Sequence, residues 1–150
     1  MALNVVLDTN LIVAALLGGG FSVRAILRGT HSGHYQPLMG AALYAEYSDV
    51  ASRTQLFTGS ALTAIERVEV MDALFSVRRW VEIYYLWRPN LPDERDNHLI
   101  ELALAGGASA IITRNICDVA RGELKFPDLH ILTPSNSWSN LRVHRNATIS

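Results

Sequence analysis

The sequence has little of what marks secreted or membrane-spanning proteins. Its single cysteine, Cys117, cannot form a disulfide within the chain, so we expect a reducing compartment. The longest apolar run, residues 11–21, is about half the roughly 20 residues that a membrane-spanning helix needs. The N-terminus has no cationic segment, and Asp8 would interrupt a signal peptide. We therefore expect a cytoplasmic protein with no membrane association.

Charge is also scarce. Charged residues make up 18% of the sequence and the net charge is −1, so the composition gives no general attraction to nucleic acid or to an anionic membrane. A local basic surface remains compatible with these numbers. The basic residues are twelve arginines and one lysine, Lys125. Arginine binds phosphate through paired hydrogen bonds and stacks on bases, although codon usage is an alternative source of the bias.

The hydrophobic content, 49% of 150 residues, excludes intrinsic disorder and predicts one folded domain over residues 1–150. A chain of this length buries roughly 70% of its unfolded surface, which is enough for a core. From about residue 134 the sequence becomes largely polar, and we predict a C-terminal tail there.

Short apolar runs alternate with segments of helical periodicity. Strands are predicted at residues 4–7, 35–39, 80–86, 110–113 and 130–132. Helices are predicted at about 9–17, 22–29, 41–51, 63–76 and 93–105, with Ser22 capping the second helix and Gly29 ending it. In the fourth helix the predicted apolar side includes Ile65, Val68 and Met71. This alternation predicts an α/β protein with a parallel sheet covered by helices on both faces.

Two carboxylates follow strands of this predicted sheet. Asp8 comes directly after residues 4–7, and Asp118 follows residues 110–113 by a few positions. Parallel α/β sheets bind their ligands at the carboxyl ends of their strands, which is where both residues fall. The alternative is that each aspartate caps a helix or, for Asp118, belongs to an ordinary loop.

Two further carboxylates fall on the apolar sides of predicted helices. Glu46 lies three residues after Leu43 and four before Val50, and Asp96 lies three before Leu99. A carboxylate on an apolar face needs a hydrogen-bond partner or an ion. Alternatively, Glu46 reaches water at the border of its stripe, and Asp96 interacts with the helix dipole in a first turn.

Together these residues predict an acidic cluster at one edge of the sheet. Two bare carboxylates about 4 Å apart repel by about 4 kcal/mol at an effective dielectric of roughly 20, so the cluster requires protonation or a cation. Hard oxygen ligands suit Mg²⁺ or Mn²⁺. Other sites fit less well: Val23 replaces the third glycine of a dinucleotide-binding motif, and no Cys/His spacing suits zinc.

Several of these segments resemble PIN domains. The string Val5-Val6-Leu7-Asp8-Thr9-Asn10 is similar to the family's opening strand. Glu46, the helical segment 93–103 with Asp96, and the strand and acidic loop 111–118 follow in the family's order. The resemblance covers nearly the whole chain, and it is strongest to toxin components of bacterial toxin–antitoxin pairs.

The resemblance implies a three-layer α/β/α sandwich and a metal-dependent endoribonuclease. The catalytic and metal-binding residues around Mg²⁺ or Mn²⁺ would be Asp8, Glu46, Asp96 and Asp118. Thr9, Asn10 and Thr113 would help to order the site. Asn115 stands where many members carry another aspartate, which puts a second metal in question and leaves Asp118 as the candidate for the missing carboxylate.

The same resemblance implies partners. The substrate would be single-stranded or looped RNA, since proteins reach splayed bases more easily than those of a duplex. Arg95, Arg114 and Arg121 flank the acidic segments and are candidate RNA contacts, with an ordinary solvated surface as the alternative. A cognate antitoxin would bind across the active-site groove, and a homodimer is also compatible with such folds.

Two other functions are compatible with the sequence. One is a metal-dependent phosphatase or another small-molecule phosphoesterase on the same scaffold. The other is a non-catalytic PIN-like binding module, which Asn115 favours.

Overall fold

The structure, a computed structural model, describes residues 2–83, 94–114 and 129–136, and the side chains of residues 94–97 lie outside this description. Within the described residues, five parallel strands form one sheet in the order β3-β2-β1-β4-β5. The strands are β1 (Leu3–Leu7), β2 (Tyr35–Met39), β3 (Arg79–Trp80), β4 (Ala110–Ile112) and β5 (His130–Leu132). The helices are α1 (Thr9–Leu16), α2 (Phe21–His31), α3 (Ala41–Ser52), α4 (Ala64–Val77) and α5 (Glu94–Gly106), with a 3-10 turn at Thr54–Phe57.

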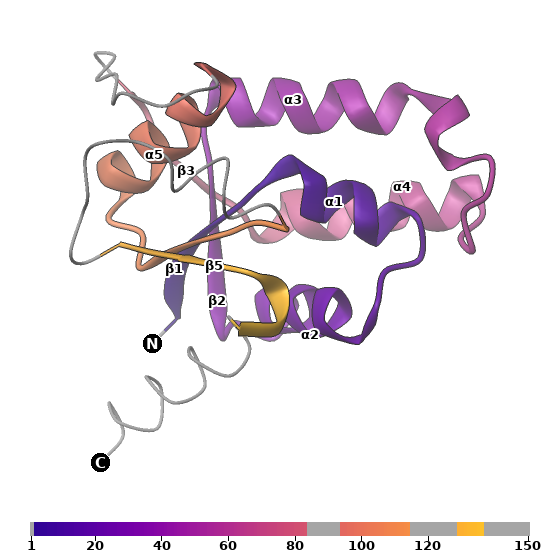
Figure 1. Cartoon of the computed structure of the whole chain (residues 1–150), viewed down its shortest axis with the longest axis horizontal. Coiled ribbons are helices and arrows are strands. Elements are labelled where there is room, and N and C mark those ends of the chain that lie inside the picture. Colours follow the sequence, from indigo (N-terminus) through magenta and orange to yellow (C-terminus); the bar gives the residue numbers. More distant parts are fainter. Residues whose placement is uncertain (1, 84–93, 115–128, 137–150) are drawn as a thin grey trace.

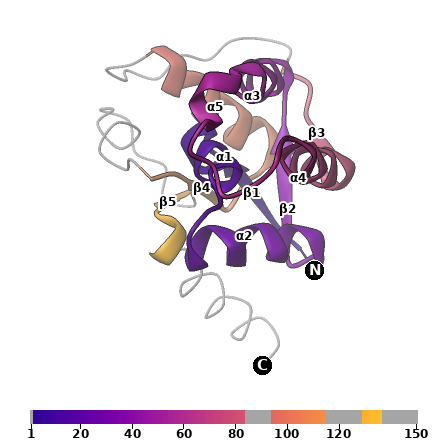
Figure 2. The ribbon, with the colours of Figure 1, turned by 90° about the vertical axis from the view of Figure 1, so that its right-hand side faces the viewer.

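Helices cover both faces of the sheet (Figure 1). Helix α5 packs on β1, β2 and β4, whereas α2 packs on β2 from the other side (Figures 1 and 2). Helix α1 continues directly from β1 and packs against α3, which also contacts α5. This arrangement confirms the predicted three-layer α/β/α sandwich with a parallel sheet.

Strand β1 is the central strand of the sheet, and its carboxyl end determines where Asp8 lies. Val5, Val6 and Leu7 are fully buried, because a central parallel strand is covered on both faces and therefore reads as a continuous apolar run. Leu7 pairs with Ile112 of β4, so the two strands end side by side. The residues that follow them, Asp8 and Thr113, are thereby placed next to each other.

Helix α2 differs from the prediction at both ends. It begins at Phe21 with Gly20 as the N-cap, so Ser22 is not its cap, and it continues past Gly29 to His31. Gly29 lies inside the helix, where the ring of Tyr35 packs directly against its backbone. A Cβ atom at Gly29 would lie 2.4 Å from Cε2 of Tyr35. The glycine therefore serves close packing of α2 on β2, and does not end the helix.

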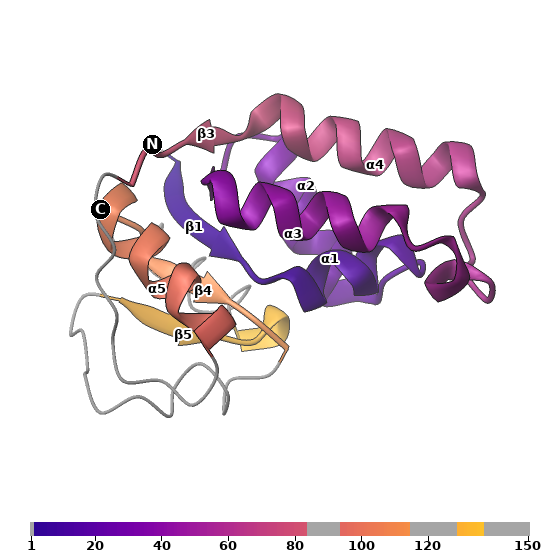
Figure 3. The same cartoon turned by 90° about the horizontal axis from the view of Figure 1, so that it is seen from above.

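Helix α4 buries a narrower face than predicted. Met71 and Leu74 are buried, but Ile65 and Val68 are 73% and 59% exposed. The helix runs beside α3 on the outside of the molecule (Figure 3), so only one side of it meets the core. Its first turn is fixed by a capping box between Thr63 and Glu66. Placing Ile65 and Val68 in the core was wrong.

The remaining elements agree with the sequence to within a few residues, apart from the predicted strand 80–86. Strand β3 is confined to Arg79–Trp80, residues 81–83 are not strand, and 84–86 lie outside the described residues. In the predicted tail, residues 134–136 form a helical turn, and Thr133 Oγ1 accepts a 3.2 Å hydrogen bond from the Asn136 N–H. The extent of the domain and of its tail stays a prediction.

Among the helices of the described ranges, no single one is long and apolar enough to cross a membrane. Helices α1 and α2 pass a length and composition test only as a pair, and they are bent by 105°.

Candidate active site

Asp8 stands at the carboxyl end of β1, in the position that the sequence predicted. Its backbone N–H donates a 2.9 Å hydrogen bond to the carbonyl of Ile112, which extends the pairing of β1 with β4. It occupies the N-cap position of α1, but its side chain makes no capping hydrogen bond. The side chain instead accepts a 2.7 Å hydrogen bond at Oδ2 from the hydroxyl of Thr113. Capping of α1 alone therefore does not account for this carboxylate.

Asn10 completes a network around the ends of β1 and β4. Its Nδ2 donates to the hydroxyl of Thr113 at 3.1 Å and to Oδ2 of Asp8 at 3.3 Å. Its Oδ1 accepts a 3.1 Å hydrogen bond from the backbone N–H of Arg114. Thr113 is fully buried, so its hydroxyl is committed to these side chains. The network fixes Asp8 and the backbone of Arg114 in one rigid unit.

Glu46 lies on α3 and is held from two other helices. Its Oε1 accepts a hydrogen bond from the hydroxyl of Thr9 on α1, and its Oε2 lies 2.8 Å from Nε2 of His98 on α5. A carboxylate only accepts hydrogen bonds, so Nε2 carries a proton in this pair. A carboxylate on an apolar helix face was expected to need a partner, and Glu46 has two, Thr9 and His98. The alternative, that Glu46 only reaches water, is therefore wrong.

The two carboxylates influence each other electrostatically. Burial is the largest cause that raises the pKa of Asp8, the charge of Glu46 raises it further, and the hydrogen bond from Thr113 opposes both. The pKa of Tyr47 is also raised, first by its complete burial and then by the charges of Asp8 and Glu46. The Tyr47 hydroxyl donates to the carbonyl of Leu7, directly before Asp8. The site thus concentrates negative charge at the end of β1.

Comparisons with known proteins identify the family and the fold. The sequence pattern of the PIN domain family matches residues 4–117, which is most of the chain. This chain belongs to the PIN domain family. A chain in the crystal structure of VapBC2 from Rickettsia felis, bound to a DNA fragment from their promoter, has the same fold, with a TM-score of 0.59 and 15% sequence identity. The similarity covers 87% of this chain and 98% of that one. No curated protein matches significantly.

This PIN domain brings together only part of the predicted set within its described residues. Asp8, Glu46, Thr9, Asn10 and Thr113 meet at one edge of the sheet, and Arg114 follows directly. Asp96 lies in the first turns of α5, but its side chain, like that of Arg95, is outside the description. Asn115, Asp118 and Arg121 lie outside the described residues altogether. Their predicted roles stay predictions.

The donor chemistry of the PIN domain site fits a hard divalent cation. Asp8 and Glu46 offer carboxylate oxygens, which Mg²⁺ and Mn²⁺ prefer. Residues 2–83, 98–114 and 129–136 contain no group of three Asp, Glu, His or Cys side chains that could hold a metal by itself. The described part therefore supplies two of the four predicted ligands.

His98 and Tyr47 also belong to the site, although no sequence pattern identified them. His98 follows Asp96 by two residues, in the segment that carries the family resemblance. Its spacing in the sequence does not indicate that it faces Glu46. Tyr47 shares the apolar side of its helix with Leu43 and is buried, with 1% exposure. The hydrogen bond from its hydroxyl to the carbonyl of Leu7 depends on how closely α3 packs on β1, which the sequence pattern does not predict.

Proposed function

We propose that this PIN domain is a metal-dependent endoribonuclease and the toxin of a toxin–antitoxin pair. PIN domains are generally nucleases. The observation that carries the proposal is that Asp8 and Glu46 are both held by side-chain hydrogen bonds at the end of the central strand, and each feels the other's charge. Carboxylates on an ordinary solvated surface are not held by several side chains. Carboxylates that bind a metal ion are oriented by hydrogen bonds of this kind.

In this proposal Asp8, Glu46, Asp96 and Asp118 hold Mg²⁺ or Mn²⁺. The bound ion would supply an activated water and neutralise charge on the phosphate that is cleaved. Thr113 and Asn10 orient Asp8, while Thr9 and His98 orient Glu46. With Asn115 in place of a further aspartate, one strongly held ion is the expected occupancy.

The proposed substrate is single-stranded RNA, and the proposed partner is an antitoxin. Arg114, next to Thr113, is exposed, and its backbone N–H is bonded to Asn10 of the same network, so it is a candidate contact for the RNA backbone. The antitoxin and the homodimer rest on the sequence resemblance, and the cytoplasmic location rests on the single cysteine and the short apolar runs of the sequence. The fold shared with a chain of VapBC2 supports the choice of this branch of the family.

The test is cleavage of an end-labelled single-stranded RNA of mixed sequence by the purified chain. We expect shorter fragments with Mg²⁺ or Mn²⁺ and none with EDTA, and slower cleavage of the same sequence as a duplex. Hydrolysis of phosphate monoesters without RNA cleavage would instead show a small-molecule phosphoesterase. Inactivity on both, together with no binding of Mn²⁺, would show a binding module.

A further inference from the structure

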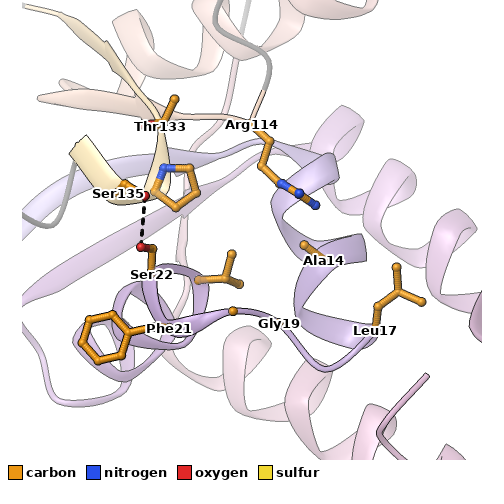
Figure 4. A pocket seen from close by; sticks show the side chains of 11 residues that line it. Ala14, Leu17, Gly19, Phe21, Ser22, Arg114, Thr133 and Ser135 are labelled. Carbon is orange, nitrogen blue, oxygen red and sulfur yellow. Dashed lines mark hydrogen bonds between the residues drawn. The ribbon is translucent and has the colours of Figure 1, made fainter. Parts of the chain in front are cut away.

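A cavity of about 520 Å³ includes in its lining Arg114, whose backbone N–H is bonded to Asn10 of the acidic site (Figure 4). It lies between the turn that joins α1 to α2, the first turn of α2, the residue after β4 and the segment after β5. The residues that line it are Ala14, Leu17, Gly19, Gly20, Phe21, Ser22, Val23, Arg114, Thr133, Pro134 and Ser135.

Hydrogen bonds hold the walls of this cavity in place. Oγ of Ser22 lies 3.1 Å from Oγ of Ser135, which joins α2 to the segment after β5 (Figure 4). The guanidinium of Arg24 donates two hydrogen bonds, of 3.1 and 3.0 Å, to the carbonyl of Gly18. Gly18 and Gly19 have positive φ values of 118° and 63°, which a residue with a side chain rarely adopts. The turn is therefore specifically built and braced.

Among the described residues that line the cavity, Arg114 is the one that carries a charge. Its backbone is tied to Asn10, and its guanidinium has no hydrogen-bond or ion-pair partner within the described ranges. Its side chain extends along the cavity toward Ala14 and Leu17 (Figure 4). A phosphate that approaches Asp8 and Glu46 meets repulsion, whereas a phosphate beside Arg114 meets an exposed cation on the residue that follows Thr113.

Phe21 provides a different kind of surface in the same cavity. Its ring is 73% exposed although it begins a helix that packs on the sheet, and it lies apart from Arg114 across the cavity in Figure 4. An exposed aromatic ring is a platform on which an unstacked base can lie. The cavity therefore combines a cation, hydroxyl groups and an aromatic face, and the described residues that line it include no carboxylate.

We propose that this cavity binds one nucleotide of the RNA substrate, next to the phosphate that is cleaved. Arg114 binds a backbone phosphate and Phe21 stacks on a base. This inference rests on the proposed ribonuclease function and adds a place where the strand is held. It also accounts for a single-stranded substrate, because a base must leave its stack to reach Phe21.

Binding of a short fluorescein-labelled single-stranded RNA, measured by anisotropy in EDTA so that no cleavage occurs, tests this proposal. Phe21→Ala and Phe21→Leu should each weaken binding roughly fivefold, the lower end for loss of one stacked base at an exposed ring. Arg114→Gln should reduce the slope of log affinity against log salt concentration by about 0.7, as expected for one lost phosphate contact on a single strand. The Phe21 variants should leave that slope unchanged.

Two matched variants serve as controls. Ile65→Ala removes a side chain that is also 73% exposed, and Arg79→Gln removes an exposed arginine on β3, outside the cavity. Both should bind RNA as the wild type does. Melting temperatures of all variants should match the wild type, because Phe21 and Arg114 lie on the surface.

The outcomes separate this inference from the proposed function. Wild-type RNA cleavage together with unchanged binding by the Phe21 variants and Arg114→Gln would overturn the nucleotide site and leave the ribonuclease intact. If those variants keep RNA binding but lose a co-purifying protein, the cavity is a protein-docking surface and the proposal is overturned. A wild type that neither binds nor cleaves RNA would overturn the function itself.

Discussion

The hydroxyl of Thr113 donates a 2.7 Å hydrogen bond to Oδ2 of Asp8 and so joins the residues that follow β4 and β1. These strands pair in register up to Leu7 and Ile112, and the side-chain bond extends that pairing beyond the sheet. The acidic site is thus built at the ends of two strands whose last three residues are all fully buried. Rigid support of this kind keeps a ligand group in one orientation.

Thr113→Val should reduce metal-dependent RNA cleavage by about tenfold, the lower range for losing a group that orients a metal ligand. Because the Thr113 hydrogen bond lowers the pKa of Asp8, its loss should raise that pKa further and move the acid limb of the pH–rate profile to higher pH. Thr30→Val is the matched control. Thr30 is also buried, and its hydroxyl bonds only the carbonyl of Leu27, at 2.7 Å, in α2. Equal rates and profiles for both variants would exclude a positioning role for Thr113.

His98→Ala should weaken Mn²⁺ binding by about tenfold, because Glu46 loses the partner that fixes its second oxygen. His98→Gln, which can still donate a hydrogen bond, should restore part of the affinity. The measurement is isothermal titration calorimetry with Mn²⁺ alone. His31→Ala, an exposed histidine at the end of α2, is the control and should titrate as the wild type does. Unchanged affinity in His98→Ala would show that the pair is only structural.

Asp8→Asn should stabilise the metal-free protein near neutral pH by about 1 kcal/mol, typical of optimising a functionally strained position. The pKa of Asp8 is raised in the folded state, so folding favours its protonated form. The resulting penalty is present above the raised pKa of the folded state and disappears as the pH falls below the ordinary pKa of an aspartate. The gain from Asp8→Asn should therefore shrink toward acid pH in urea unfolding.

Metal should reverse this ranking. At roughly a hundredfold excess over the dissociation constant, Mn²⁺ should stabilise the wild type by about 2.7 kcal/mol, and Asp8→Asn by less. Equal stability of the two proteins with EDTA and with Mn²⁺ would remove Asp8 from the proposed metal site.

Tyr47→Phe should lower the free energy of unfolding by about 1–3 kcal/mol, because the buried carbonyl of Leu7 loses its hydroxyl donor. Tyr44→Phe, three residues earlier on the same helix and 43% exposed, should change it by less than about 0.5 kcal/mol. Urea unfolding of both variants makes the comparison. A Tyr47→Phe protein as stable as Tyr44→Phe would show that water replaces the hydroxyl without cost.

The sequence predicts the sheet well because buried parallel strands leave a clear signal. Residues 4–7, 35–39 and 130–132 are strands almost as predicted, and so is the order of helices between them. It also places Asp8 correctly, since a residue that directly follows a buried strand must stand at the edge of the sheet. Glu46 is the harder case. Its stripe shows that it needs a partner, but only tertiary packing shows that Thr9 and His98 provide one.

The errors arise where packing overrides local preference. Ser22 is a good cap by type, yet Gly20 takes that position and the Ser22 hydroxyl faces Ser135. Gly29 is a residue type that often ends a helix, yet here it lies inside α2. The ring of Tyr35 packs so closely on it that a larger residue would not fit. Ile65 and Val68 fit an apolar stripe, but α4 lies at the margin of the core.

RNA cleavage by three single-residue variants tests the central claim most directly. Asp8→Asn and Asp96→Asn should each reduce the Mn²⁺-dependent cleavage rate by more than about 100-fold, since loss of a direct ligand exceeds the cost of losing its support. Asp72→Asn, an exposed aspartate on α4, should cleave at the wild-type rate. All three should remain folded by circular dichroism. Wild-type cleavage by purified Asp8→Asn would contradict the account, because the acidic site at the end of β1 would then not be where the chemistry occurs.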